Sequence, residues 1–380
     1  MKLTYIFKTL SKIPDPRQPW KIKHNLAEIL LICILAVTAG ANSSGEIYLF
    51  AIKRKEWLKQ FMLLENGIPG RLTIERILQR MNGKTFNAVF KDIMKHIQTA
   101  SKGTVISIDG KACFSSAGAQ GAAGVITMVS AWCSTNGLVL GQVEAGEKKN
   151  EISVIPELLK LLDIKGATVT LDAMGCQKHI ARQIVKENKA DYMLALKKNH
   201  QTFWEEAALY ASFCLTDPNM SDAYSQFTKI EKGHGRLEKR TYTLFHDLSW
   251  FEDIKAWEGL RSLVMVESTV THLKGSKPPS HEMRYYISSL NDLHESAHAI
   301  RSHWSVENNL HWVLDVVFKE DAWKTKSDRS AAFLSVLRRV TLNLLRAEKD
   351  TGLSGPQKRF ACALDPSLLE KVVFRSPLFS

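Results

Sequence analysis

Residues 104–111 read TVISIDGK, a short run rich in β-branched apolar residues that ends at an aspartate followed by a glycine. Such a run, stopped at Asp109-Gly110, predicts a buried strand and is too short for a comfortable helix. The pattern returns at residues 167–172, ATVTLD, which end at Asp172. Two strands that bring their terminal aspartates together would form a site for a hard cation such as Mg²⁺. Either aspartate alone is equally compatible with a turn former or a helix N-cap.

The order of the segments around these two strands predicts an α/β fold. Strand-like runs at 125–132 and 138–144 are joined through Asn136-Gly137, a dipeptide that tolerates the positive φ angles of a hairpin turn. The segments that follow are a helix at 151–162, the strand ending at Asp172, a helix at 176–189 and a strand at 192–196. This is the order of a ribonuclease H-like fold, in which the first and fourth strands are neighbours. We therefore expect Asp109 and Asp172 to lie side by side.

The remaining segments predict the domain organisation. Residues 1–100 are basic and helical in pattern, which suits a DNA-binding or associated N-terminal domain, or a cap over the core of the next domain. Residues 101–350 form the predicted α/β domain with a β-rich insertion at about 203–290, and residues 351–380 form a peripheral tail. The most apolar stretch, 29–41, is shorter than the roughly 18 to 20 residues of a membrane span, which favours a buried helix.

A third carboxylate stands in the helical pattern of residues 299–315. Four polar residues recur there at every fourth position and so fall along one helix face, namely His303, Glu307, His311 and Asp315. We expect the buried side of this helix to be supplied by Trp304, Val306, Leu310 and Trp312. A ladder of histidine and glutamate is also compatible with a zinc site, although the HExxH motif of helix-borne zinc enzymes is absent.

Composition restricts the class of partner and the compartment. The chain of 380 residues has a formal net charge of +12 and a pI near 9.3, which favours a polyanionic partner, nucleic acid first. Its six cysteines contain no CxxC pair, which indicates reduced, buried thiols in a cytoplasmic protein. The segment 231–240, EKGHGRLEKR, is crowded with cations and is either a phosphate contact or a solvated hairpin.

Several motifs together resemble one protein family. They are the IPDPR motif at 13–17, ENGIP at 65–69, IDGK at 108–111, NEI at 150–152, DAMGCQ at 172–177 and HWSVEN at 303–308. On these motifs the chain resembles the H-repeat-associated proteins, a branch of bacterial insertion-sequence transposases of the DDE type (the ISAs group). The resemblance covers nearly the whole chain. It implies a ribonuclease H-like catalytic domain with a β-rich insertion, and a catalytic triad that falls on Asp109, Asp172 and Glu307.

The resemblance also implies an activity, which is transposition of an insertion sequence by DNA cleavage and strand transfer at the ends of the element. The triad would hold two Mg²⁺ ions, with Mn²⁺ as a substitute. The implied partners are double-stranded DNA, at terminal inverted repeats and at the target, and a second copy of the chain on DNA. The implied location is the bacterial cytoplasm, at the nucleoid. The candidates for DNA contacts are Lys111, Lys197, Lys198, His234, Arg236, His303 and His311.

The chain departs from the pattern of this family at several positions. Where the broader superfamily often has a tyrosine, an arginine and a lysine around the glutamate, this chain has Ile300, His303 and Leu314. Departures also occur around Ala112 and His200. Two alternatives therefore stay open beside the transposase, namely a ribonuclease H-like nuclease without strand transfer and an inactive DNA-binding remnant.

Overall fold

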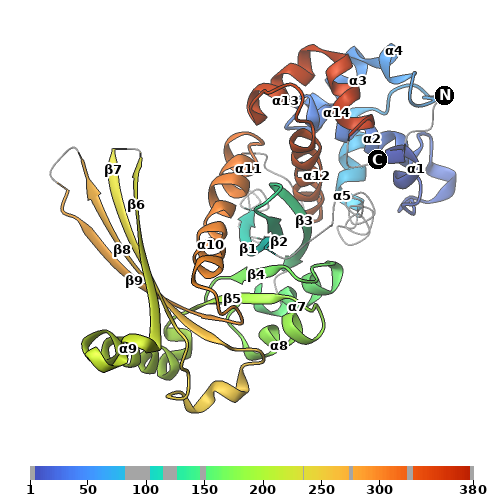
Figure 1. Cartoon of the computed structure of the whole chain (residues 1–380). Helices are drawn as coiled ribbons and strands as arrows, with labels where there is room; N and C mark the ends of the chain where they lie inside the picture. The colour runs from blue at the N-terminus through green and yellow to red at the C-terminus, as the bar shows by residue number, and fades with distance from the viewer. Residues whose placement is uncertain are drawn as a thin grey trace. The chain divides into compact units, whose positions relative to one another are not determined.

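The computed structural model of the chain describes residues 5–81, 103–113, 126–145, 151–233, 235–273, 277–322 and 328–376. The chain divides into two compact units, and Figure 1 labels the helices and strands of both. The first unit comprises Met1–Thr99, Gly110–Leu162 and Val306–Ser380, and the second comprises Ala100–Asp109 and Asp163–Ser305. One boundary falls inside strand β1 (Val105–Cys113), directly after Asp109.

The second unit is built on a sheet with the strand order β1-β4-β5-β9-β8-β7-β6. The strands that follow β1 along the chain are β4 (Thr168–Leu171), β5 (Asp191–Leu196), β6 (Tyr224–Gly233), β7 (Arg236–Phe245), β8 (Ser262–His272) and β9 (Ser280–Ser288). Strand β4 pairs in parallel with both β1 and β5. Helix α8 (Lys178–Lys186) makes the connection between β4 and β5 that a parallel pair requires. The predicted pairing of the first strand with the fourth is thus confirmed.

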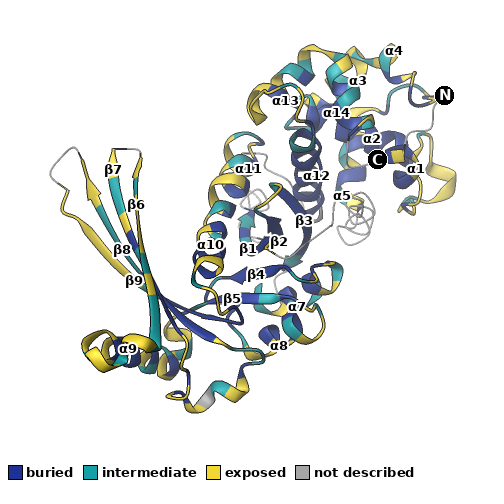
Figure 2. Ribbon diagram, in the orientation of Figure 1, coloured by how far each residue is buried: buried dark blue, intermediate teal, exposed yellow. Residues whose placement is uncertain are grey.

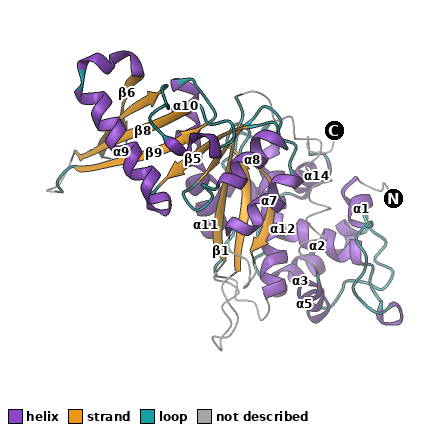
Figure 3. Ribbon diagram, turned by 90° about the horizontal axis from the view of Figure 1, so that it is seen from below, coloured by secondary structure: helices purple, strands orange, loops and turns teal. Residues whose placement is uncertain are grey.

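The β-rich insertion continues this sheet. Its last strand, β9, pairs antiparallel with β5, and β8, β7 and β6 follow in antiparallel succession. Helix α9 (Gln201–Thr216) precedes these strands in the chain and contacts β9 (Figure 3). In β8 and β9 the halves next to β5 are mostly buried, whereas the far ends are exposed (Figure 2). The insertion therefore adds an antiparallel arm whose outer part is open to solvent.

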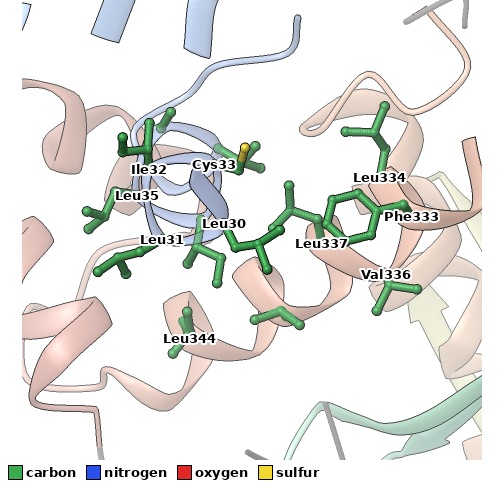
Figure 4. Packing of buried hydrophobic residues seen from close by; sticks show 14 of the residues in the cluster. Leu30, Leu31, Ile32, Cys33, Leu35, Phe333, Leu334, Val336, Leu337 and Leu344 are labelled. Carbon is green, nitrogen blue, oxygen red and sulfur yellow. The ribbon is translucent and has the colours of Figure 1, made fainter. Parts of the chain in front are cut away.

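The first unit has a helical core around α2 (Leu26–Thr38) and α12 (Asp328–Ala347). Every residue of α2 is buried, as expected for its nearly continuous apolar sequence. The helix begins at Asn25, whose side chain accepts a hydrogen bond from the amide of Ala27 at 2.8 Å. Figure 4 shows leucines of α2, Leu30 among them, in one cluster with Phe333 and Leu337 of α12. A helix that is apolar all round is stable only when neighbours cover every side of it.

The predicted hairpin is present in the first unit. Strands β2 (Ile126–Cys133) and β3 (Leu138–Ala145) pair antiparallel, and Gly137 in the connecting turn has a φ of +70°. Glycine adopts this backbone angle without the steric cost that a side chain would add. Helix α7 (Glu151–Leu161) packs on this hairpin.

Further helices complete the two units. In the first unit they are α1 (Tyr5–Leu10), η1 (Pro19–Lys21), α3 (Ser44–Lys53), α4 (Lys55–Leu58), α5 (Arg71–Arg80), η6 (Glu307–His311), α11 (Trp312–Val316), α13 (Gly355–Leu364) and α14 (Pro366–Phe374). In the second unit they are η3 (Lys198–His200), η4 (Pro218–Ala223), η5 (Glu252–Ala256) and α10 (Leu293–His303). Among the helices of the described residues, none has both the length and the apolarity needed to cross a membrane. All six cysteines are buried, and none of them forms a disulfide.

The two ends of the chain contribute to one core. Residues of α1 to α5 lie in the same buried cluster as residues of α12 and α14. A DNA-binding role for residues 1–100 stays a prediction. The expectation of a peripheral tail after residue 350 was wrong, because Cys362, Leu369 and Val373 of α13 and α14 are buried in this core. The apolar residues at helical spacing in 366–374 are the sequence signal that indicates a buried helix face in this region.

Candidate active site

Two carboxylates of the second unit stand at equivalent positions on neighbouring strands, where the paired stretch of β1 and β4 ends. The expected stop of the first strand at Asp109-Gly110 was wrong, because β1 continues to Cys113. Asp109 follows Ile108 in β1, and Asp172 follows Leu171, the last residue of β4. Ile108 and Leu171 are partners in the parallel register of the two strands. Because adjacent strands lie about 4.8 Å apart, this register brings the backbones of the two aspartates to neighbouring positions. The pairing is the one that the order of segments predicted.

Asp172 also forms the turn that follows its strand. Its Oδ1 accepts hydrogen bonds from the amides of Met174 at 3.0 Å and Gly175 at 3.2 Å. The turn fixes the carboxylate at the end of β4, so a structural role and a ligand role are compatible here. Nearby, burial raises the pKa of the Cys176 thiol to about 12, and this group therefore stays protonated at neutral pH.

His303, at the end of α10, is bonded to β4 and, through Thr170, linked to β1, just before the two aspartates. Its Nδ1 lies 2.9 Å from Oγ1 of Thr170, which in turn donates to Oγ of Ser107 at 3.1 Å. Thr170 stands two positions before Asp172, and Ser107 two positions before Asp109. His303 was expected to contact DNA, and the structure gives its Nδ1 a partner within the protein.

Glu307 and His311 lie in the first unit, in a π-helical turn, η6. The side chain of Glu307 is 67% exposed, and its Oε2 lies 3.1 Å from Nδ1 of His311. Burial and the charge of Arg339 lower the pKa of His311, against the opposing effect of Glu307. His311 is therefore neutral at pH 7, and a carboxylate partner requires that Nδ1 carries the proton. A π-turn of this kind is rare and often lies at a functional site.

The tryptophans of this region are not on the buried side, which corrects the expectation. The relative exposure of Trp304 is 45% and that of Trp312 is 53%, whereas Val306 and Leu310 are buried. At about 100° per residue, positions 304 and 306 lie about 200° apart on a helix, so one face cannot bury both. Trp304 instead stacks with Arg284 of β9, whose guanidinium lies 4.3 Å from the ring centroid.

The basic residues predicted to contact DNA have different surroundings. Lys197 and Lys198 are exposed at the end of β5, next to the turn that holds Asp172. Asn199 donates to the carbonyl of Ala173 at 2.7 Å, which fixes the lysines beside that turn. Arg236 is exposed at the outer end of the insertion, at the start of β7. His234 lies outside the described residues.

Lys111 is buried, and its ammonium faces three carboxylates of the first unit. Its Nζ lies 2.8 Å from Asp315, 3.6 Å from Asp321 and 3.7 Å from Glu320, and the side chain is 7% exposed. Burial by itself would lower the pKa of Lys111, but these carboxylates outweigh burial and raise it. The pKa of Asp315 is raised as well, by burial and by the two neighbouring acids, which together outweigh Lys111.

Two buried arginines complete this group, which we call the charge cluster. Its members are Lys111, Asp315, Glu320, Asp321, Arg338 and Arg339. Glu320 Oε1 lies 3.2 Å from Arg339 Nη1 and 3.8 Å from Arg338 Nη1, and the Glu320 and Arg339 side chains are fully buried. This cluster was not predicted from the sequence. Its only sequence signal is the position of two arginines within an otherwise apolar run.

Comparison with known proteins identifies the family. The family model described as Transposase DDE domain matches residues 95–344, and the one described as DDE_Tnp_1-associated matches residues 7–94. The chain is 39% identical over 381 residues to "Putative transposase YncI" of Escherichia coli O157:H7, a match that spans 98% of this chain and 95% of that protein. It is 37% identical over 383 residues to "H repeat-associated putative transposase YhhI" of Escherichia coli strain K12, with 100% of both chains covered.

Among solved structures, a piggyBac transposase synaptic complex with hairpin DNA has a TM-score of 0.48 and 12% identity, over 97% of this chain and 77% of that chain. The family assignment rests on the sequence matches alone. They extend over nearly all of the chain. The chain therefore belongs to the family of transposases with a DDE domain, with H repeat-associated proteins among its relatives.

Proposed function

We propose that this transposase cleaves and joins DNA with Asp109, Asp172 and Glu307, on a ribonuclease H-like arrangement of β1, β4 and β5. The observation that carries the proposal is the parallel register of Ile108 with Leu171, which brings Asp109 and Asp172 to neighbouring positions. Two neighbouring carboxylates where a parallel strand pair ends suit a cation site. Membership of the family with a transposase DDE domain supports this chemistry.

Two contacts support the inclusion of Glu307. Four residues before it, His303 is bonded to Thr170 of β4, and eight residues after it, Asp315 is paired with Lys111 of β1. The intervening chain is helical for most of its length, so it has little freedom between these points. The chain that carries Glu307 is thus bonded to β4 before the glutamate and to β1 after it, which supports the inclusion of Glu307 in the proposed triad.

The donor set fits hard divalent cations. All three groups are carboxylates, which suits Mg²⁺ or Mn²⁺ better than softer metals. Oδ2 of Asp172 accepts no hydrogen bond from the described part of the chain, so the turn leaves one oxygen for a ligand. The bond from His311 would orient Glu307 in the way that outer partners orient metal ligands. A bound pair of ions would supply charge stabilisation for the attacking and leaving oxygens.

The substrate under this proposal is double-stranded DNA. Lys197 and Lys198 lie exposed beside the Asp172 turn, where they would bind backbone phosphates and set the position of the strand. Water attacks the phosphorus at the end of the element, and the bond from phosphorus to the 3′ oxygen breaks. The freed 3′-hydroxyl then loses its proton to solvent and attacks a phosphodiester of the target, which releases a target 3′-hydroxyl.

Charge-removing substitutions test the triad. Asp109→Asn, Asp172→Asn and Glu307→Gln should each abolish cleavage of a DNA end and leave DNA affinity within about twofold, because the basic surface is unchanged. Asp163→Asn, an exposed aspartate outside the site, is the matched control and should cleave like the wild type. An Asp172→Asn protein that nicks at the wild-type rate would overturn the proposal.

The product distribution separates the transposase from its alternatives. Joining of a precut end to target plasmid supports strand transfer, whereas cleavage without joining indicates a plain nuclease. DNA binding without either reaction indicates an inactive remnant. Elemental analysis tests the zinc alternative, since stoichiometric zinc that disappears in His311→Gln would replace the two-magnesium proposal.

A further inference from the structure

Lys111 shares one face of β1 with Asp109. Side chains alternate between the two faces of a strand, so residues 107, 109, 111 and 113 point to the same side. Ser107 approaches the carbonyl of Ser302 at 3.5 Å, and the thiol of Cys113 lies 4.0 Å from the hydroxyl of Ser335. Lys111 is thus the first neighbour of the candidate catalytic aspartate on its own face.

The charge cluster around Lys111 is balanced. Three cations, Lys111, Arg338 and Arg339, stand against three anions, Asp315, Glu320 and Asp321. Burial makes this balance consequential, because a charge that loses its partner in a poorly solvated place is strongly destabilising. An ammonium committed to three carboxylates has little capacity left for a DNA phosphate. The cluster therefore points to a role inside the protein.

The ion pair of Lys111 with Asp315 also connects two segments that carry the proposed triad. Lys111 follows Asp109 by two residues in β1, and Asp315 follows Glu307 by eight residues in the helical stretch. Lys111 Nζ and Asp315 Oδ1 lie 2.8 Å apart, and this charged hydrogen bond fixes the helical stretch relative to β1. Loss of this ion pair would leave the helical stretch that carries Glu307 and Asp315 freer to shift relative to β1.

We infer that Lys111 is a positioning residue, whose ammonium fixes the helical stretch that carries Glu307 against β1 through Asp315 and thereby sets the affinity of the proposed triad for a divalent cation. This inference rests on the proposed function. It predicts that Lys111 controls metal affinity without touching DNA. Outer partners of metal ligands typically change metal affinity by about 10- to 100-fold when they are removed.

Mn²⁺ binding to the full-length protein without DNA tests this inference, with isothermal titration calorimetry as a readout that needs no turnover. Lys111→Met should weaken Mn²⁺ binding by about tenfold or more. Lys111→Arg keeps the charge and should recover part of the loss. Lys59→Met is the matched control, because Lys59 pairs with Glu56 at the surface of the same unit, and it should bind Mn²⁺ like the wild type.

Lys111→Met leaves one anion in excess and could fail to fold, so a second variant is needed. The double variant Lys111→Met with Asp315→Asn removes one charge of each sign and keeps the remaining cluster balanced. The double variant lacks the ion pair between β1 and the helical stretch, so it should also bind Mn²⁺ about tenfold more weakly. It should keep a cooperative melting transition.

The outcomes are distinguishable. A lower melting temperature with unchanged Mn²⁺ affinity in both variants would overturn the inference and leave Lys111 a purely structural residue. A salt dependence of DNA binding that falls by about one unit of slope in Lys111→Met, and not in the charge-preserving Lys111→Arg, would assign the lysine to a phosphate and overturn the inference. Wild-type protein that binds Mn²⁺ no better than Asp109→Asn would instead overturn the proposed function itself.

Discussion

Replacing Glu320 by glutamine is expected to destabilise the first unit strongly. The Glu320 side chain is fully buried, 3.2 Å from Arg339 and 3.7 Å from Lys111, and it joins the two halves of the charge cluster. Glutamine has nearly the same shape, so the substitution tests charge and not volume. It would leave three buried cations facing two anions.

The size of the effect follows from that imbalance. Breaking a buried pair by removing one partner costs about 3–5 kcal/mol. The glutamine oxygen still accepts a hydrogen bond from Arg339, which favours the lower end, about 3 kcal/mol. For a unit of this size the fall in melting temperature is roughly 2 °C per kcal/mol, or about 6 °C. Glu56→Gln, in an exposed pair with Lys59, should change stability by no more than about 0.5 kcal/mol.

Urea unfolding of four proteins measures this effect, namely wild type, Glu320→Gln, Arg339→Met and the double variant. The two changes should be non-additive by about 1–3 kcal/mol, because each single variant leaves a buried charge that the other change removes. A Glu320→Gln protein within 1 kcal/mol of the wild type, or strict additivity, would refute the claim that this pair is held by mutual charge compensation.

Three further results are expected. Burial would raise the pKa of Glu320, but Arg339, Arg338 and Lys111 lower this pKa below 4.5. The ionised Glu320 therefore stabilises the folded protein above pH 4.5, and this stabilisation is lost as the pH falls. Between pH 7 and pH 3 the melting temperature should therefore fall less steeply for Glu320→Gln than for the wild type. His303→Ala, which removes the bond to Thr170, should cost about 1 kcal/mol and slow cleavage, and an unchanged cleavage rate would contradict the anchoring of the helix. Leu30→Ala should cost about 2–5 kcal/mol, whereas the exposed Leu49→Ala should cost almost nothing in the same denaturation assay.

The neighbouring positions of Asp109 and Asp172 were accessible from sequence because they depend on local pattern and chain order, although β1 continues past Asp109 to Cys113. A β-branched run that ends in aspartate and glycine identifies the strand, and the succession of strands and helices identifies its neighbour. The register of Ile108 with Leu171 then follows from ordinary pairing rules. The hairpin at Asn136-Gly137 was predictable for a similar reason, since its turn chemistry is local.

The charge cluster was not accessible in this way. Lys111 is far in sequence from Glu320 and Arg339, which are 19 residues apart, and each looks like a solvated residue in its own segment. Only tertiary packing shows that their charges cancel. The wrong expectation for Trp304 has a different origin. Its size and hydrophobicity suggested burial, but its angular position on the helix relative to Val306 does not allow both side chains to be buried on one face. The π-turn at Glu307 has no sequence signal that separates it from an α-helix.

The composition of the first unit from both ends of the chain has a consequence for synthesis on the ribosome. Helix α2 ends at Thr38, and its partner α12 begins at Asp328, roughly 290 residues later. At a translation rate of about 5–20 residues per second, the apolar surface of α2 remains uncovered for about 15–60 s until α12 is synthesised. During that interval the nascent chain carries an uncovered hydrophobic helix, which is a substrate for chaperones and for aggregation. We expect the yield of native protein to depend on how that helix is protected while the rest of the chain is translated.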